Sequence, residues 1–278
     1  MKTKDLSKRK FSSGTKRSAL DVKVNQVNWI YSQQNANINN FSNILNLNQE
    51  LQELWLELVI WIETHITVTN TKTKLFCSCL NDTESAPNTN ICPICTWKDT
   101  SSPQVNLDVV KSATFLSNAL WWKLANTLSF DRKHYSYPDL PKWYQITQYR
   151  DPISKWWSVP FMRPDGTEWK VDIDHFHIEE DPAKLTYLKN WKIDLDFNRS
   201  GKPLFEVVTT PSIHSIEDAI LYMEQLQKIV RYTWVSDADM EKWHFKSDVS
   251  LSLRKAGTND LNPRTEIKNL NSFKFALQ

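Results

Sequence analysis

Only four of the 278 residues are glycine, although average usage of about 7% predicts roughly twenty. Glycine is used where the backbone needs a positive φ angle or where two backbone segments approach closely. Nearly all such positions in this chain must therefore be filled by other residues. Thirteen residues are tryptophan, which is far more than usual, and a bulky side chain is poorly suited to a positive φ.

The composition is that of a soluble globular protein, with 40% hydrophobic and 24% charged residues. The length fits one large or two ordinary domains. The sequence contains no apolar run long enough for a membrane-spanning helix. The first residues are basic and lack an apolar signal core, so we expect a cytoplasmic protein.

Residues 1–53 are interpreted as a basic, Asn-rich N-terminal extension that is disordered, with order beginning near Leu54. Residues 1–24 contain eight Lys or Arg and two Asp or Glu, and an Asn- and Gln-rich run follows. A basic arm of this kind can follow a phosphate backbone. The plainer interpretation is a solvated tail.

Strand patterns outnumber helix patterns, which favours an α+β fold with a mixed or antiparallel sheet core and packed helices. The segment "WIETHITV" alternates strictly, placing Trp61, Glu63 and His65 on one face of a strand. A helix is predicted from apolar spacing over 107–125, and another from Ser215, where Asp218 completes a capping box. The predicted strands cover residues 57–69, 171–181, 203–209 and 245–254.

All four cysteines lie in one segment, as two close pairs: Cys77 and Cys79, then Cys92 and Cys95. Two pairs separated by a short loop can present four thiolates to Zn²⁺ in a tetrahedron. Disulfides are the alternative, but they are rare in cytosolic proteins. We therefore predict a loop fixed by zinc in a closed, structural site.

Acidic residues embedded in strand segments need a partner or a metal ion. Several carboxylates with one histidine suit a hard cation such as Mg²⁺, particularly one shared with nucleotide phosphates. Solvated or salt-bridged side chains are the alternative at each position. The residues concerned are Glu63, His65, Glu179, Glu180, Asp181, Glu206, Asp248, Arg264, Glu266 and Lys268.

Six motifs carry a resemblance to a known family. In order they are "IETHITVTNTKTKLFCSC", "PNTNICPIC", "FDRKHYSYPDLPKWYQITQY", "HIEED", "DFNRSGKPLFEVVTTP" and "RTEIKNLNSFKF". Together they resemble the B subunit of the aspartyl/glutamyl-tRNA amidotransferases, from about Leu54 to Gln278. Residues 54–278 are therefore interpreted as that family's catalytic (cradle) domain.

The resemblance implies a ligase that works as a heterotrimer with A and C subunits on misacylated Glu-tRNA(Gln) or Asp-tRNA(Asn). The B subunit would phosphorylate the side-chain carboxylate with ATP and Mg²⁺, and ammonia from glutamine would then form the amide. It implies Mg²⁺ ligation by Glu63, His65, Glu180 and Asp248, support from Glu206 and Glu266, phosphate or tRNA contacts by Lys184, Arg264 and Lys268, and zinc binding by the four cysteines.

The chain also departs from the family. It stops at "NLNSFKFALQ", where the family continues into a helical region and a tail domain, so we expect a truncated chain. Thr210 stands where an acidic residue is usual, and Ser247 and Ser250 replace Cys and Asn. These departures leave open a non-catalytic RNA-binding or assembly protein. A zinc-ribbon nucleic-acid module alone would explain only the cysteines.

Several tryptophans coincide with glycines of the resembled family, namely Trp61, Trp97, Trp143, Trp234 and Trp243. Replacements of this kind would each cost a few kcal/mol against a total stability of about 5–15 kcal/mol. We hypothesise that many of these codons are UGA, translated here as tryptophan but read as glycine by the source organism. A decaying gene is the alternative, although decay would not spare the carboxylates and cysteines.

Overall fold

The structure is a computed structural model that describes residues 47, 49–82, 84–97 and 102–277. Most of the predicted N-terminal extension lies outside these residues, whereas residues 49–53 are helical. The strands are β1 (Leu56–Thr67), β2 (Asp131–His134), β3 (Tyr144–Thr147), β4 (Ser154–Met162), β5 (Glu168–Glu180), β6 (Lys184–Tyr187), β7 (Ile193–Asp196), β8 (Pro203–Thr209), β9 (Phe245–Lys255) and β10 (Thr265–Leu270). The helices are α3 (Pro93–Thr96), α4 (Leu107–Ala119), the 3₁₀ turn η1 (Lys189–Trp191), α5 (Ile216–Tyr232) and α6 (Phe273–Leu277).

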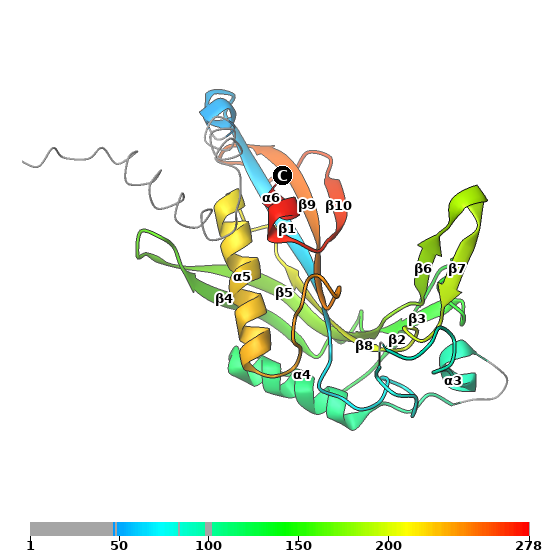
Figure 1. Cartoon of the computed structure of the whole chain (residues 1–278). Coiled ribbons are helices and arrows are strands. Elements are labelled where there is room, and N and C mark those ends of the chain that lie inside the picture. The colour runs from blue at the N-terminus through cyan, green and yellow to red at the C-terminus, as the bar shows by residue number, and fades with distance from the viewer. Residues whose placement is uncertain (1–46, 48, 83, 98–101, 278) are drawn as a thin grey trace, which may run out of the picture.

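Six strands form one sheet in the order β10-β9-β1-β8-β5-β4, and every neighbouring pair is antiparallel (Figure 1). Two hairpins, β2–β3 and β6–β7, each form a separate two-stranded sheet, and β3 contacts the end of β5 through Gln145 and Ile146. The few helices and the antiparallel sheet confirm the predicted α+β class. No helix of the described chain is long and apolar enough to cross a membrane.

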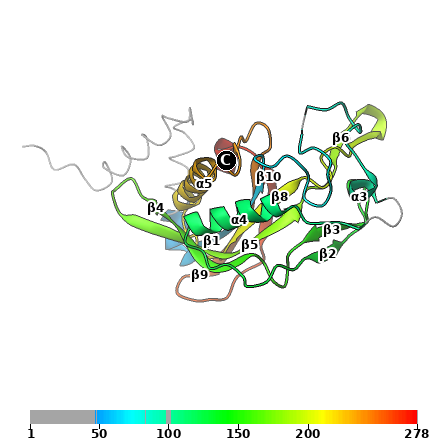
Figure 2. The same cartoon turned by 90° about the horizontal axis from the view of Figure 1, so that it is seen from below.

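The helices α4 and α5 pack on one face of the sheet, as Figure 2 shows from below. Each begins with a side-chain cap, because Asn106 accepts the N–H of Asp108 at 2.9 Å and Ser215 accepts that of Asp218 at 3.0 Å. The second hydrogen bond of the predicted capping box, from the backbone N–H of Ser215 to the Asp218 side chain, is not formed among the described residues. The Asp218 carboxylate instead accepts two hydrogen bonds from Arg163.

Strict alternation along β1 separates the core from a polar face. Ile60, Ile62 and Ile66 are at most 2% exposed and join side chains of α4 and α5 in one hydrophobic cluster. Glu63 and His65 lie between them on the opposite face. The predicted strands 57–69, 171–181, 203–209 and 245–254 correspond to β1, β5, β8 and β9 within three residues at each end.

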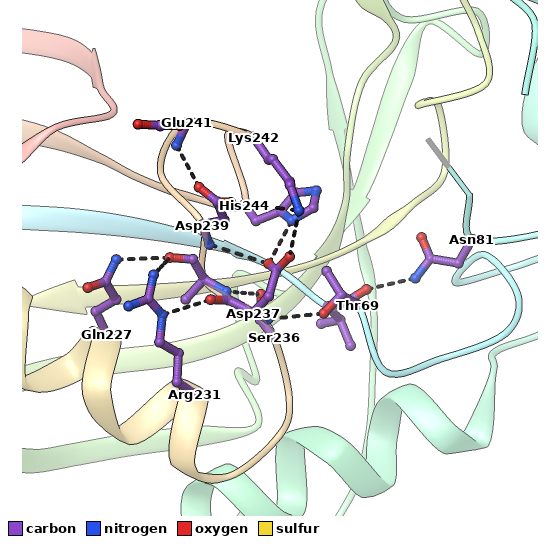
Figure 3. A network of polar contacts seen from close by, with 12 residues as sticks. Thr69, Asn81, Gln227, Arg231, Ser236, Asp237, Asp239, Glu241, Lys242 and His244 are labelled. Atoms are coloured by element: carbon purple, nitrogen blue, oxygen red, sulfur yellow. Dashed lines mark hydrogen bonds and ion pairs between the residues drawn. The ribbon is translucent and has the colours of Figure 1, made fainter. Parts of the chain in front are cut away.

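The connection from α5 to β9 is held by polar contacts on both sides (Figure 3). Arg231 donates to the carbonyl groups of Asp237 and Ala238, and Gln227 donates to Ala238 as well. The Asp237 carboxylate lies 2.7 Å from His244 Nδ1, and the backbone N–H of Asp237 donates to the Thr69 hydroxyl. The path of the backbone between the helix and the strand is therefore fixed at several points.

Candidate functional site

The polar face of the sheet gathers three carboxylates from three adjacent strands: Glu63 of β1, Asp248 of β9 and Glu266 of β10. We call these the acidic trio. Glu63 pairs with Asp248 in the antiparallel register, and the carboxylate oxygens of the trio lie within 4.8 Å of one another. An irregularity in β10 brings the N–H of Asn269 to 2.6 Å from Asp248 Oδ1. The trio thus has the oxygen donors and the spacing that a hard cation requires.

The electrostatics of the trio favour a bound cation. Burial raises the pKa of Glu63, the negative charge of Glu206 raises it further, and Glu266 and Asp248 contribute in the same direction. A divalent ion would relieve this repulsion, so the residues present fit Mg²⁺. Two cations are nearby: Lys268 Nζ of β10 lies 3.5 Å from Glu266, and the guanidinium of Arg264, directly before β10, lies 6.0 Å from the centroid of the Trp61 ring.

A second cluster lies beside the trio on β1, β8 and β5. We call it the histidine cluster; it contains His65, His177, Glu179 and Glu206. His65 Nε2 lies 3.2 Å from Glu206 Oε2, and His177 Nε2 lies 3.6 Å from the same oxygen and 3.5 Å from Glu179. The ring of His175 stacks on that of His177, with centroids 5.2 Å apart. Glu206 therefore lies close to both imidazoles, with the shorter contact to His65.

Contacts within this cluster offset the effect of burial on the pKa values of Glu206, His65 and His177. Burial opposes the charge of Glu206, but its hydrogen bond with His65 and the charge of His177 leave its pKa well below the usual range. Burial likewise lowers the pKa of His65, but the contact with Glu206 outweighs it and the net pKa is raised. The buried Nδ1 atoms of both imidazoles have no hydrogen-bond partner within the described chain.

Glu180 lies apart from both groups. Its carboxylate forms a buried ion pair with Lys142 and accepts the N–H of Ile146 at 2.9 Å. The alternation of β5 explains this position, since Glu179 shares the face of His175 and His177 whereas Glu180 lies on the other.

The four residues predicted to ligate Mg²⁺ are thus distributed over three neighbouring arrangements. Glu63 and Asp248 are together in the acidic trio, His65 is beside Glu206, and Glu180 contacts neither. No group of ligand atoms within 4.8 Å unites the four in the described residues, and their ligation of Mg²⁺ stays a prediction. Lys184 begins β6 on the separate β6–β7 hairpin and is exposed there.

Three further residues of this region are His177, Glu179 and Lys142; the first and the last carry no role predicted from the sequence, and Glu179 is predicted only as one of several possible cation ligands. The first two follow from the same alternation that groups Glu63 with His65, because "HFHIEE" places His175, His177 and Glu179 on one face. Lys142 lies in the loop before β3, where no periodic pattern indicates its partner. Only the tertiary structure brings it to Glu180.

The four cysteines form a compact group at the start of α3, on the side of the β6–β7 hairpin (Figure 1). Their sulfur atoms lie within 4.8 Å of one another, and none is in a disulfide. The N–H of Cys92 donates to Cys95 Sγ at 3.2 Å, and Nζ of the fully buried Lys74 lies 3.7 Å from the same sulfur. The arrangement provides four soft donors and positive charge to balance them.

The thiol pKa values differ across the group. The hydrogen bond from Cys77 lowers the pKa of Cys95 to about 4, while burial raises that of Cys79 to about 11. The pKa of Cys77 is also raised, chiefly by its bond to Cys95. A divalent ion such as Zn²⁺ would allow all four sulfurs to bind as thiolates, so the donor set fits zinc.

Purified protein is expected to contain one zinc per chain, bound by four thiolates at about 2.3 Å. Metal analysis by mass spectrometry and X-ray absorption at the zinc edge would measure both quantities. The Cys95→Ser variant removes the buried ligand and should lose the metal. Protein without zinc, or with pairwise sulfur bonds at about 2 Å, would contradict the assignment.

Comparison with known proteins gives the family. A model of the family described as the GatB/GatE catalytic domain matches residues 58–278. The B subunit of the aspartyl/glutamyl-tRNA(Asn/Gln) amidotransferase of Borreliella burgdorferi (strain ZS7) is 41% identical over 222 residues, which cover 78% of this chain and 45% of that protein. The protein of the same name from Campylobacter jejuni subsp. doylei is 41% identical over 219 residues, covering 79% and 46%.

The chain spans about half the length of the curated relatives it matches. The matched region begins two residues into β1 and includes the cysteine group, the acidic trio and the histidine cluster. Because that match covers well over half of the sequence, the chain belongs to the GatB/GatE catalytic-domain family.

Proposed function

We propose that this chain is the catalytic part of the B subunit of a tRNA-dependent amidotransferase. In the proposed reaction, the side-chain carboxylate of Glu-tRNA(Gln) or Asp-tRNA(Asn) attacks the γ-phosphorus of ATP, and ADP leaves. Ammonia derived from glutamine then attacks the acyl carbon, the C–N bond forms and inorganic phosphate departs. The proposed enzyme is thus a ligase. We propose that the chain works in a heterotrimer with an A subunit and a C subunit.

The observation that carries this proposal is the acidic trio on the polar face of the sheet. Phosphoryl transfer depends mainly on positioning and charge neutralisation. We propose that Glu63, Asp248 and Glu266 hold Mg²⁺ with help from His65, and that the ion, when bound, neutralises phosphate charge. Glu206 orients His65 through their contact at 3.2 Å. Arg264, directly before β10, and Lys268 of β10 are both exposed, and they are proposed to contact the phosphates or the tRNA end.

Location follows from the substrates: a protein that acts on aminoacyl-tRNA is proposed to work in the cytoplasm, as expected from the sequence. The cysteine group is proposed to hold zinc in a structural role, because four sulfur ligands leave no open coordination position.

The test is amide formation by the chain purified with A and C subunits. Misacylated Glu-tRNA(Gln) and Asp-tRNA(Asn) are supplied separately with ATP, Mg²⁺ and glutamine, and Gln-tRNA and Asn-tRNA are quantified. The Asp248→Asn variant should lose the activity, whereas Asp260→Asn, at an exposed position between β9 and β10, should retain it. Absence of product from both tRNAs would refute the proposal.

A further inference from the structure

We infer that eight positions written as tryptophan are occupied by glycine in the polypeptide that the source organism makes. Eight of the twelve described tryptophans have a left-handed backbone, with φ between 54° and 64°. Only two asparagines and one alanine share this property among the other non-glycine residues of the described chain. The eight tryptophans are Trp55, Trp97, Trp121, Trp143, Trp156, Trp191, Trp234 and Trp243.

Two of these positions terminate the long helices in the manner typical of glycine. After α4, the N–H of Trp121 donates to Asn118 and that of Trp122 donates to Ser117, which is the hydrogen-bond pair of a Schellman motif. After α5, the N–H of Trp234 donates to Arg231 at 3.0 Å. Both residues stand at the C′ position, where glycine is strongly enriched because it has no Cβ to clash.

The β6–β7 hairpin gives a third example. The N–H of Leu188 donates to the carbonyl of Lys192, which closes a loop of three residues, and η1 occupies that loop. Hairpins of this length use a type I turn followed by a residue in the left-handed region, which is usually glycine. Trp191 fills that position with φ 62° and is fully exposed.

The connection between α5 and β9 leaves little freedom to relax such a backbone. Its middle is fixed by Asp237, Arg231 and His244 (Figure 3). Trp234 lies between Arg231 and Asp237 in the sequence and Trp243 lies directly before His244, with φ 58° and 62°. The contacts of Asp237 and Ala238 with Arg231, Thr69 and His244 fix the path of the backbone. Trp234 and Trp243 must therefore keep the left-handed conformation for the chain to follow this path.

Packing explains tryptophan poorly at the eight positions, because among them only Trp97 meets another aromatic ring of the described chain, edge-on against Tyr144 with centroids 5.5 Å apart. The side chains at the eight positions are between 45% and 100% exposed. The contrast is Trp122, which is 4% exposed, has an ordinary φ and packs on Phe176 with ring centroids 5.3 Å apart. Trp169 also has an ordinary φ and lies under the Arg163 guanidinium at 4.0 Å. These two tryptophans have a role for an indole ring, so the backbone angle sorts the tryptophans into two kinds.

The φ angles change the set of tryptophans for which the family resemblance indicated glycine. Trp97, Trp143, Trp234 and Trp243 have a positive φ, whereas Trp61 lies inside β1 without one. The structure adds Trp55, Trp121, Trp156 and Trp191. The inference stands on backbone geometry and is independent of the proposed function.

Mass spectrometry of tryptic peptides from protein isolated from the source cells tests this inference. The peptide of residues 112–123, "SATFLSNALWWK", contains one position of each kind. We expect glycine at position 121 and tryptophan at 122, with two different codons in the gene. The peptide "WWSVPFMR" should likewise carry glycine at 156 and tryptophan at 157. Tryptophan at both positions of a pair would overturn the inference, and glycine at both would overturn the sorting by φ.

Thermal unfolding of recombinant variants gives a second, matched test. Trp121→Gly should raise Tm by a few degrees, about 2–4 °C, because it relieves a left-handed backbone. Trp122→Gly, the same change one residue later, should lower Tm because it leaves a cavity beside Phe176. A loss of similar size in both variants would contradict the requirement for glycine at position 121.

Discussion

Replacing Lys142 by methionine is expected to lower the free energy of unfolding by about 3–5 kcal/mol. The Lys142 and Glu180 side chains are only 3% and 4% exposed. Without the ammonium group, the carboxylate would keep the N–H of Ile146 as a partner but would be a buried charge without a counterion. Methionine retains most of the volume of the side chain, so the loss reports on charge rather than on packing. Urea unfolding at neutral pH measures it.

The same variant should be least destabilised in acid. Burial raises the pKa of Glu180 even against the opposing charge of Lys142, and removing Lys142 raises it further. A carboxyl with a raised folded pKa stabilises the fold below its unfolded pKa, near 4.5, and this contribution is lost as pH rises through the folded pKa. The deficit of Lys142→Met should therefore grow from about pH 4.5 to neutrality.

A matched control is Lys170→Met, which removes an exposed ion pair in which Lys170 Nζ lies 3.3 Å from Asp172 Oδ1. Its effect should stay below about 1 kcal/mol. Adding Glu180→Leu to Lys142→Met should recover much of the lost stability, since both charges are then gone. Equal small losses in the two single variants would show that the buried pair is not important for stability.

Glu63→Gln is expected to reduce tRNA-dependent ATP hydrolysis by at least about 100-fold, by comparison with the losses seen for residues that only support a metal ligand. The substitution keeps the shape of the side chain and removes one carboxylate from the acidic trio. In the proposed complex, glutamine hydrolysis by the A subunit should persist, because the proposal assigns that reaction to another subunit. Phosphate release and glutamate release, measured in parallel on the assembled protein, separate the two steps.

The stability of Glu63→Gln distinguishes a site residue from a structural one. Burial and neighbouring carboxylates raise the pKa of Glu63, so its charge is unfavourable without a bound cation. The variant should therefore unfold at the same or a higher temperature in the absence of Mg²⁺. Glu241→Gln, an exposed control in the α5–β9 connection, should retain activity. Full activity of Glu63→Gln would exclude Glu63 from the proposed mechanism.

Much of the fold could be predicted from the alternation of apolar and polar residues along the strands. In β1 and β9 one face is apolar and the other polar, and the register then places Glu63 opposite Asp248. The helix predicted over 107–125 ends at Ala119, because the Schellman motif at Trp121 turns the chain. The strands β2, β6 and β7 have only four residues each and are mostly exposed, so no buried face gives them a hydrophobic pattern.

The site was predictable where its residues share a strand and less so where a loop supplies the partner. The grouping of Glu63 with His65 on one face follows from their spacing alone. Whether Glu179 or Glu180 shares the polar face depends on the phase of the alternation in β5. That phase is set by buried Phe176 and Ile178, which lie on the face of Glu180. Lys142 could not be paired in advance, because 38 residues separate it from Glu180.

The register of β1 makes the length of this strand as important as its composition. Ile62 and Ile66 lie in the core, and Glu63 and His65 lie between them on the other face. Inserting or deleting one residue within β1 would exchange the two faces, sending a carboxylate and an imidazole into the hydrophobic cluster. Gene variants that change the number of residues should therefore survive only in the connections, while single substitutions in β1 can still be tolerated.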